Sequence, residues 1–281
     1  MSRSFIFPIA VFLLMTGCTS TKRISDYSTS ALKTIEKFDE LGHTFMKACK
    51  DKCYLENVRE LKLSTDECQC APEQTADNVT SALYNVIKGY YDGLVKLSAN
   101  ELTSYKTDAL KKQLTSGTFG DVKIDKTDVD AYTKLSSVLL TAFTAGYRSK
   151  KLNSYVGEAN EPIQILIRLL KINLASNLIG RIQVHRQRLQ SVYFDLLQDP
   201  AASSYEKKNI IDAYHGEIDE LESKISKISI FSKGLNSVAA GHQKLYDNRN
   251  KMSPKEIKVM LVQYVSDLED VLSEFNKTKS K

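Results

Sequence analysis

The chain has 281 residues, of which 42% are hydrophobic, and this is enough for a sizeable core in one or two domains. Its formal net charge of +5 is a mild basic excess, which does not indicate a nucleic-acid-binding protein. After the first residues, no apolar run reaches the roughly 20 residues that a membrane-spanning helix needs, so the sequence indicates a soluble domain.

The chain starts with the layout of a secretory signal peptide. Arg3 supplies a short positive region, an apolar run follows from Phe5 to Met15, and the small residues Thr16 and Gly17 come next. The apolar run has about 11 residues, which is too short to cross a bilayer as a helix. We therefore expect the first residues to be a leader that is removed.

The end of this leader resembles the lipobox of bacterial lipoproteins. Met15-Thr16-Gly17-Cys18 has an apolar residue, two small residues and then a cysteine, although Leu is the commonest residue in place of Met15. The resemblance implies cleavage before Cys18 and acylation of its thiol, and Thr19 in the next position implies the outer membrane rather than the inner one. An ordinary signal peptide with cleavage nearby is the alternative.

The predicted domain organisation follows from this leader. We expect a signal peptide over 1–17, a lipidated cysteine with a short tether over 18–24, and an all-helical domain over 25–281, with room for a sub-boundary near 117–127. The mature chain would keep 264 residues and a net charge of about +4, because Arg3 is the only charged residue removed.

The four other cysteines lie within one short segment. Cys49 and Cys53 share a face of a helix, and Cys68 and Cys70 share a face of an extended segment. In an oxidising compartment an even number of cysteines favours disulfides. Antiparallel segments predict the nested pairs Cys53–Cys68 and Cys49–Cys70; the crossed pairing and a Cys₄ zinc site are the alternatives.

Three helices are predicted in the first half of the domain. Apolar residues three and four apart predict a helix from Ser25-Asp26 to about Cys53. A second helix starts after Pro72, and the capping box Ser98-Ala-Asn-Glu101 predicts the start of a third. Gly117-Thr-Phe-Gly120 indicates a loop after that helix.

Longer helices are predicted in the second half. One runs from Asp128 to about Lys151, and Asn160-Glu-Pro162 is expected to open the most apolar helix, which extends to about Gln198. The capping box Ser203-Ser-Tyr-Glu206 predicts a helix to about Asn250. Ser253-Pro-Lys-Glu256 predicts the last helix, which ends near Asn276.

The fold class predicted from these elements is all-α. We expect an elongated multi-helix bundle with long antiparallel helices and a disulfide-stapled N-terminal helix-loop segment. Val122 to Ile124 is the only, weak, strand candidate, and serine and glycine favour a kink near Ser229 to Gly234. The two longest helices would reach about 55–70 Å.

Two basic clusters are the candidate binding residues. Arg181, His185 and Arg188 share a helix face and could contact an anion or an acidic partner; ion pairs with a neighbouring helix are the alternative. Arg148, Lys150 and Lys151 could contact anionic headgroups or simply complement a helix C-terminus.

No catalytic or metal motif accompanies these clusters. The sequence has no H-E-x-x-H, G-x-S-x-G or P-loop, and its four histidines, His43, His185, His215 and His242, are expected to be surface or partly buried polar residues. We expect no metal, cofactor or nucleic acid, and we expect the small residues between Gly234 and Asn250 to allow close helix packing.

The expected function is therefore that of a non-enzymatic outer-membrane lipoprotein, whose helical bundle binds another envelope protein or acts as a scaffold. A periplasmic inhibitor, immunity or exclusion factor against a toxin, phage or secreted protein is the alternative. An enzyme whose site gathers residues from separate helices is the third class.

Overall fold

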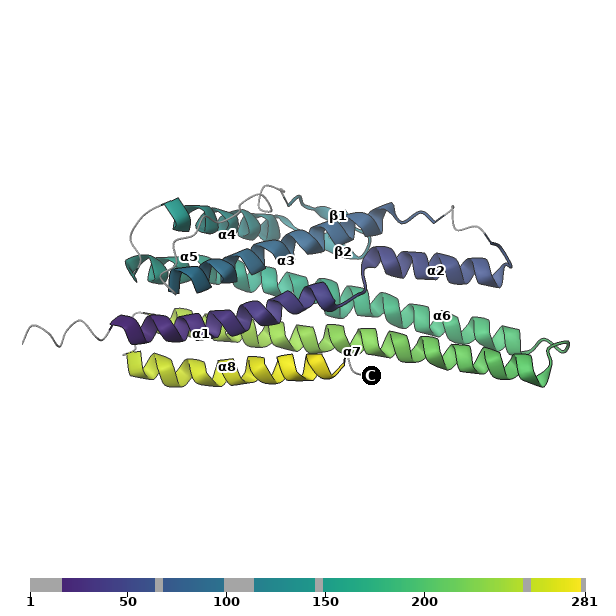
Figure 1. Cartoon of the computed structure of the whole chain (residues 1–281). Helices are drawn as coiled ribbons and strands as arrows, with labels where there is room; N and C mark the ends of the chain where they lie inside the picture. The colour runs from purple at the N-terminus through teal and green to yellow at the C-terminus, as the bar shows by residue number, and fades with distance from the viewer. Residues whose placement is uncertain (1–16, 64–67, 99–113, 145–148, 250–253, 279–281) are drawn as a thin grey trace, which may run out of the picture.

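The computed structural model describes residues 17–63, 68–98, 114–144, 149–249 and 254–278. These residues form an elongated helical bundle with one small β-hairpin, which confirms the predicted all-α class (Figure 1). The elements in chain order are α1 (Gly17–Glu36), the 3₁₀ helix η1 (Lys37–Glu40), α2 (Phe45–Arg59), α3 (Ala71–Ser98), β1 (Gly117–Phe119), β2 (Val122–Ile124), α4 (Lys126–Thr144), α5 (Ser149–Lys171), the π-helical segment η3 (Ile172–Leu178), α6 (Ile179–Leu197), α7 (Ser204–Asn248) and α8 (Pro254–Lys277).

Four helices form the centre of the bundle. α1 contacts α3, α3 contacts α5, α5 contacts α7, and α7 contacts α1, so these helices close a ring around the core. α8 packs on the seam between α1 and α7, and α4 packs on the seam between α3 and α5. Side chains from all four central helices, such as Tyr27, Leu83, Leu166 and Leu235, are completely buried.

The bundle changes in thickness along its length. α1, α4, α5 and α8 lie beside only one part of α7, and beyond them the structure consists mainly of α2, α6 and the beginning of α7 (Figure 1). We call residues 45–63, 179–197 and 204–220 the outer half and the remaining bundle the inner half. No residue of α7 before Leu221 is buried, so the outer half has a much thinner core than the inner half.

The first predicted helix is wrong in extent, because the chain breaks between η1 and α2. Gly42 has φ +68, a left-handed conformation that glycine adopts without a steric cost. Thr44 then caps α2 by accepting a hydrogen bond from the N–H of Lys47. The helix before the break starts at Gly17 rather than near Ser25, so the predicted tether is helical.

Asp77 of α3 strengthens the start of α2. Its two carboxylate oxygens accept hydrogen bonds from the backbone N–H groups of Phe45 and Met46, at 2.8 and 3.0 Å. A carboxylate at a helix N-terminus also interacts favourably with the helix dipole. The apolar spacing continues across the break, through Leu41 and Phe45, and this is why the sequence pattern did not reveal it.

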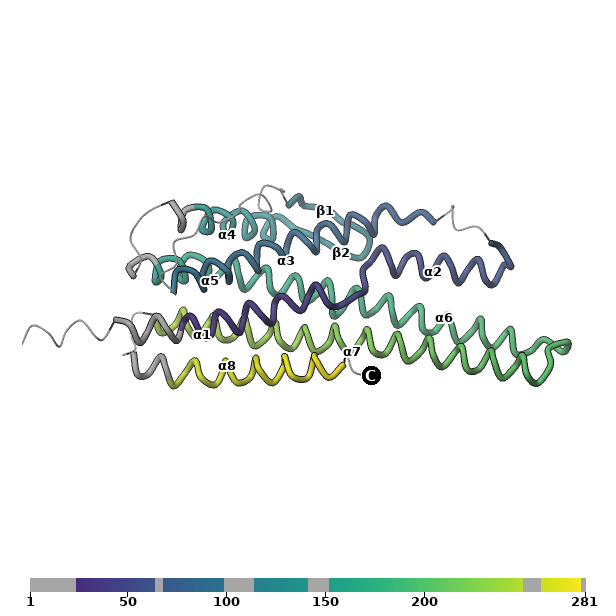
Figure 2. The backbone as a smooth tube through the Cα atoms, in the orientation of Figure 1, coloured from purple at the N-terminus to yellow at the C-terminus, as the bar shows by residue number. Residues whose placement is uncertain are grey.

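The most apolar helix starts earlier than predicted. Pro162 lies inside α5 rather than at its start, and α5, η3 and α6 form one continuous helical rod from Ser149 to Leu197 (Figure 2). By length and composition, the stretch Leu152–Leu197 is long and apolar enough to cross a membrane. Many of its apolar side chains are core residues of the bundle, however, such as Ile163 and Leu166, which are completely buried. The preceding helix, α4, ends at Thr144 instead of Lys151.

The glycine-rich segment after residue 116 is a hairpin instead of a loop. Gly117 pairs with Ile124 and Phe119 with Val122 in an antiparallel register, and Gly120 takes the positive φ that the turn requires. Val122 and Ile124 are buried while Lys123 points to solvent, so the weak strand candidate is a true strand.

The remaining boundaries agree with the sequence. Ser203 and Glu206 form the predicted capping box at the start of α7, and Pro254 is the first residue of α8. α7 stays α-helical through Ser229–Gly234, where a kink was expected. The helix predicted after Ser98 falls on residues 99–113, which lie outside the described residues.

Candidate functional site

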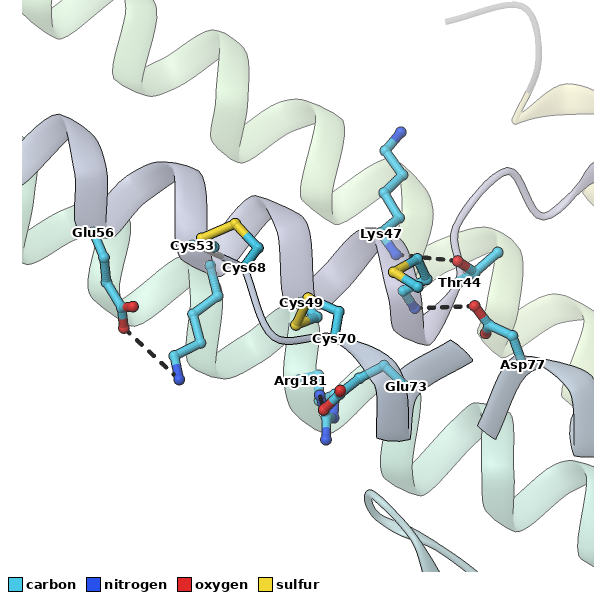
Figure 3. The surroundings of a disulfide bond; sticks show 12 residues. Thr44, Lys47, Cys49, Cys53, Glu56, Cys68, Cys70, Glu73, Asp77 and Arg181 are labelled. Carbon is cyan, nitrogen blue, oxygen red and sulfur yellow. Dashed lines mark hydrogen bonds and ion pairs between the residues drawn. A yellow bond between two sulfur atoms is a disulfide. The ribbon is translucent and has the colours of Figure 1, made fainter. Parts of the chain in front are cut away.

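The two disulfides of the chain have the predicted nested pairing. Cys49 bonds to Cys70 and Cys53 to Cys68, with Cα–Cα distances of 6.0 and 5.9 Å that are ordinary for disulfides. Both join α2 to the short stretch that precedes α3 (Figure 3). The crossed pairing and the zinc site are therefore wrong.

The disulfides matter because α2 has little core of its own. Phe45, Ala48 and Leu55 are its only buried residues, and α2 packs mainly against α3 and α6. Closing a loop of about 15 residues contributes roughly 3 kcal/mol in the chain-entropy model. The staple thus replaces part of the apolar contact that would otherwise hold a helix in place.

The predicted basic face on α6 consists of paired arginines. Arg181 contacts Glu73 at 2.8 Å and Asp121 at 2.5 Å, which links α6 to α3 and to the hairpin turn. Arg188 contacts Glu56 of α2 at 3.0 Å, and the neighbouring Arg186 contacts Glu222 of α7 at 3.3 Å. The ion pairs that the spacing left open as an alternative are thus present.

His185, the third member of that face, lies between the helices. Its Nδ1 atom is buried and has no hydrogen-bond partner among the described residues. Burial lowers the pKa of His185, with smaller opposing effects from the carboxylates of Asp51 and Glu217. The ring is therefore held as neutral imidazole.

His43 has a similar environment on the link between η1 and α2. Its side chain is only 6% exposed, and its Nδ1 atom also has no partner within the described part of the chain. Burial and, to a smaller extent, the ammonium groups of Lys224 and Lys47 lower its pKa to about 4. His185 is close enough to contribute to this shift.

His185 lies at one end of an elongated groove between α2, α6 and α7. We call this cavity of about 420 Å³ the α2–α7 groove. His43 lines a separate cavity, but its charged neighbours Lys47 and Lys224 line this groove. The inner end of the groove is polar and contains Lys47, Asp51, His185, Glu220 and Lys224. The remainder is lined mainly by apolar and aromatic side chains: Tyr54, Leu55, Val58, Leu189, Val192, Tyr193, Leu196 and Leu221.

The outer half also carries many exposed apolar side chains, of which Tyr54 and Leu196 line the groove. Among the described residues, eight of the twelve exposed large apolar side chains belong to the outer half: Tyr54, Leu61, Leu63, Val184, Phe194, Leu196, Tyr205 and Ile211. Such clustering differs from the single exposed apolar residues of ordinary surfaces. The outer half therefore has the character of a contact surface.

Leu61, at the end of α2, has an unusual backbone conformation as well as an exposed apolar side chain. Its φ is +55, a left-handed conformation that disfavours branched side chains and is usually given to glycine after a helix. Its side chain is also 88% exposed. The conformation closes the helix end, because the N–H of Lys62 donates to the Asn57 carbonyl at 2.8 Å and the N–H of Leu61 donates to the Val58 carbonyl at 3.2 Å.

A separate polar layer lies at the centre of the inner half. His242 of α7 accepts a hydrogen bond at Nε2 from the Tyr90 hydroxyl, 2.6 Å away, while its Nδ1 lies 3.0 Å from the Asn160 Oδ1 atom. Since an amide oxygen only accepts hydrogen bonds, Nδ1 must donate, and the ring is neutral. Burial lowers the pKa of His242 to about 3.

Tyrosines complete this layer. The Tyr27 hydroxyl donates to the Val238 carbonyl at 2.6 Å, and the Tyr155 hydroxyl donates to the Tyr90 carbonyl at 3.0 Å. The expectation of a surface or partly buried histidine is thus wrong for His242, which is completely buried. The layer takes one or more residues from each central helix, so it has the character of a structural network.

The other predicted residues lie on the surface, at a close helix contact or outside the described residues. His215 is exposed on α7. Gly234 faces Thr34 closely enough that an added methyl group would lie 2.6 Å from its Cγ2 atom, so the small residues do allow close packing. The side chains of Cys18, Arg148, Lys150 and Lys151 lie outside the described part of the structure.

No group of three or more His, Cys, Asp and Glu side chains suited to a metal ion occurs among the described residues. The chain matches no protein-family model, no curated protein and no solved structure.

The groove and the central layer were not predicted. Both take their residues from helices far apart in the sequence, and each residue alone continues an ordinary amphipathic pattern. The one local signal was the short apolar segment Leu61-Lys-Leu63, which follows the last buried residue of α2 and whose two leucine side chains are exposed.

Proposed function

We propose that this protein is a lipid-anchored outer-membrane lipoprotein that binds another envelope protein through its outer half. The observation that carries the proposal is the large share of exposed apolar side chains on the part of the bundle with the thinner core. Interfaces place aromatic and aliphatic anchors at their centre, and Tyr54, Phe194 and Tyr205 have that chemistry.

The geometry of the bundle supports an anchor at the opposite end. α1 begins at Gly17 near one end of the molecule, and the connection between α6 and α7 lies at the other end (Figure 1). At 1.5 Å per residue, the 45 residues of α7 extend about 67 Å. A lipid on Cys18 would thus leave the outer half directed toward a partner.

The proposed anchor would be short. The six residues Thr19–Ile24 are helical and span about 9 Å, against about 20 Å for an extended tether. The inner half would lie close to the membrane, and the partner would have to reach the outer half at the far end of the bundle.

Site-specific photocrosslinking in intact envelopes tests the proposal. A photoreactive residue at Tyr54, Phe194 or Tyr205 should crosslink one envelope protein in good yield. The matched control is Val262, an apolar residue that is 48% exposed on α8 in the inner half. Equal crosslinking from Val262, or no crosslink from the three outer positions, would refute the proposed surface.

A Cys18→Ala variant tests the anchor separately. We expect it to remain unprocessed and to lose its acyl chains, as shown by intact mass of detergent-extracted protein. A processed, membrane-bound Cys18→Ala protein would refute lipidation but not the contact surface. The identity of the crosslinked partner distinguishes a scaffold from an inhibitor.

A further inference from the structure

We propose that low pH opens the α2–α7 groove, because protonation of His43 and His185 weakens the packing of α2 against α6 and α7. This inference rests on the proposed function, since the groove belongs to the partner-binding surface. It is carried by the way α2 is attached, by the two imidazoles beneath it and by the groove itself.

The attachment of α2 is one-sided. Cys49 and Lys52 face a second cavity on the side of the disulfides, whereas Lys47, Asp51 and Tyr54 face the α2–α7 groove. The disulfide bonds tie the first side to the stretch before α3, as Figure 3 shows. Movement of α2 is therefore limited to a rotation about its disulfide edge, and that rotation widens the groove toward α7.

His43 lies where such a rotation would begin. The charged groups around it are Lys47 on α2 and Lys224 and Glu220 on α7, with His185 on α6. Glu220 cannot easily act as its counter-ion, because its carboxylate already contacts the Lys224 ammonium at 2.7 Å. A proton on His43 would thus add a third positive charge beside two lysines.

The other side of His43 offers no free counter-ion either. There it lines a cavity of about 270 Å³ together with Asp39 and Asp77. Asp39 accepts a hydrogen bond from the Tyr84 hydroxyl at 2.7 Å, and Asp77 caps α2. Both carboxylates are engaged in contacts that hold the neighbouring elements.

His185 adds to the same effect from α6. Lys224 and Arg188 oppose its protonation, whereas Asp51 and Glu217 favour it. Burial outweighs these carboxylates, and a protonated Nδ1 would be a buried donor with no acceptor among the described residues. Rotation of α2 would admit water to both rings.

The size of the effect follows from proton linkage. A histidine in water has a pKa of about 6.5, against about 4 for His43 while α2 is closed over α6 and α7. Between pH 7.5 and pH 5, His43 alone would then shift the equilibrium toward the open groove by up to about 30-fold. Ordinary carboxylates remain ionised over most of this range, so the histidines are the groups that respond.

Hydrogen exchange followed by mass spectrometry tests this on the full chain with its disulfides intact. After correction for the intrinsic pH dependence of exchange, amides of residues 47–58 should exchange about 10- to 30-fold faster at pH 5 than at pH 7.5. Residues 79–94 of α3 exchange through global unfolding and should stay much more strongly protected than α2 at both pH values. A His43→Gln, His185→Gln double variant should lose the pH response, and His215→Gln is the matched control on an exposed histidine.

The wild-type profile alone can overturn the proposal. Unchanged protection of α2 at pH 5 would refute it. Protection of α2 equal to that of α3 at pH 5 would also refute it, because α2 would then open only by global unfolding, to which His242 contributes. Where the double variant does not fold, His185→Gln should still reduce the response. Exchange requires no partner, so failure here leaves the crosslinking prediction untouched, and failure of crosslinking leaves the acid opening standing.

Discussion

The buried histidine of the central layer makes a quantitative prediction about acid stability. His242 is completely buried and neutral, and its two ring nitrogens bond Tyr90 and Asn160. The unfolded chain exposes the imidazole, whose pKa is then about 6.5, while the folded value is about 3. Because the folded state binds the proton less well, stability is complete above pH 6.5 and falls as the pH drops below it.

The magnitude follows from the same two pKa values. Between pH 7 and pH 5, His242 should cost about 2 kcal/mol of unfolding free energy, and His43 a similar amount. A His242→Gln variant can keep one donor toward Asn160 and one acceptor toward Tyr90 but cannot titrate. Its loss of stability between pH 7 and pH 5 should therefore be about half that of the wild type.

A second variant separates titration from hydrogen bonding. His242→Ala removes both bonds and leaves the Tyr90 hydroxyl and the Asn160 amide oxygen unsatisfied, at about 1–3 kcal/mol each. We expect it to be several kcal/mol less stable than the wild type at pH 7. Urea unfolding followed by circular dichroism, without reductant, measures both variants. Identical pH dependence of the wild type and His242→Gln would refute the assignment of the acid effect to this ring.

Two further perturbations test the staple and the helix packing. Cys53→Ser with Cys68→Ser should remove roughly 3 kcal/mol from the attachment of α2, so that limited proteolysis cuts α2 first while the central helices stay intact; simultaneous cleavage throughout the bundle would contradict this. Gly234→Ala should destabilise the protein by about 1–3 kcal/mol, because the added methyl group would clash with Thr34. Gly216→Ala has open space around it and should stabilise the protein by up to about 1 kcal/mol. Thermal unfolding measures both variants.

The sequence predicted the features that depend on local spacing. Four cysteines spaced four and two residues apart have few pairings, and the nested one follows from antiparallel segments. The capping box at Ser203 is equally local, because both of its hydrogen bonds lie within four residues. The same holds for the small residues around Gly234, whose packing role follows from their size alone.

Local rules failed where tertiary contacts compensate for a local cost. Pro162 lacks the N–H that an interior helical position uses, yet the surrounding apolar residues Ile163 and Leu166 are buried and keep α5 continuous. Gly42 breaks a helix whose apolar spacing continues undisturbed, and Asp77, more than thirty residues away, makes the new start favourable. Neither the continuous helix at Pro162 nor the break at Gly42 can be predicted without knowing which helix packs against that segment.

The two halves of the bundle are stabilised in different ways. The inner half surrounds a polar layer in which His242, Tyr27 and Tyr155 have hydrogen-bond partners, and such a network fixes one register of the four central helices. The outer half contains His185, whose Nδ1 has no partner among the described residues, and a helix that is held by disulfides as well as by a small core. Stability concentrated at one end allows the other end to expose apolar surface and to move without unfolding the protein. A covalent staple is suited to this arrangement, because it limits how far α2 can move without reducing the exposed surface that a partner would cover.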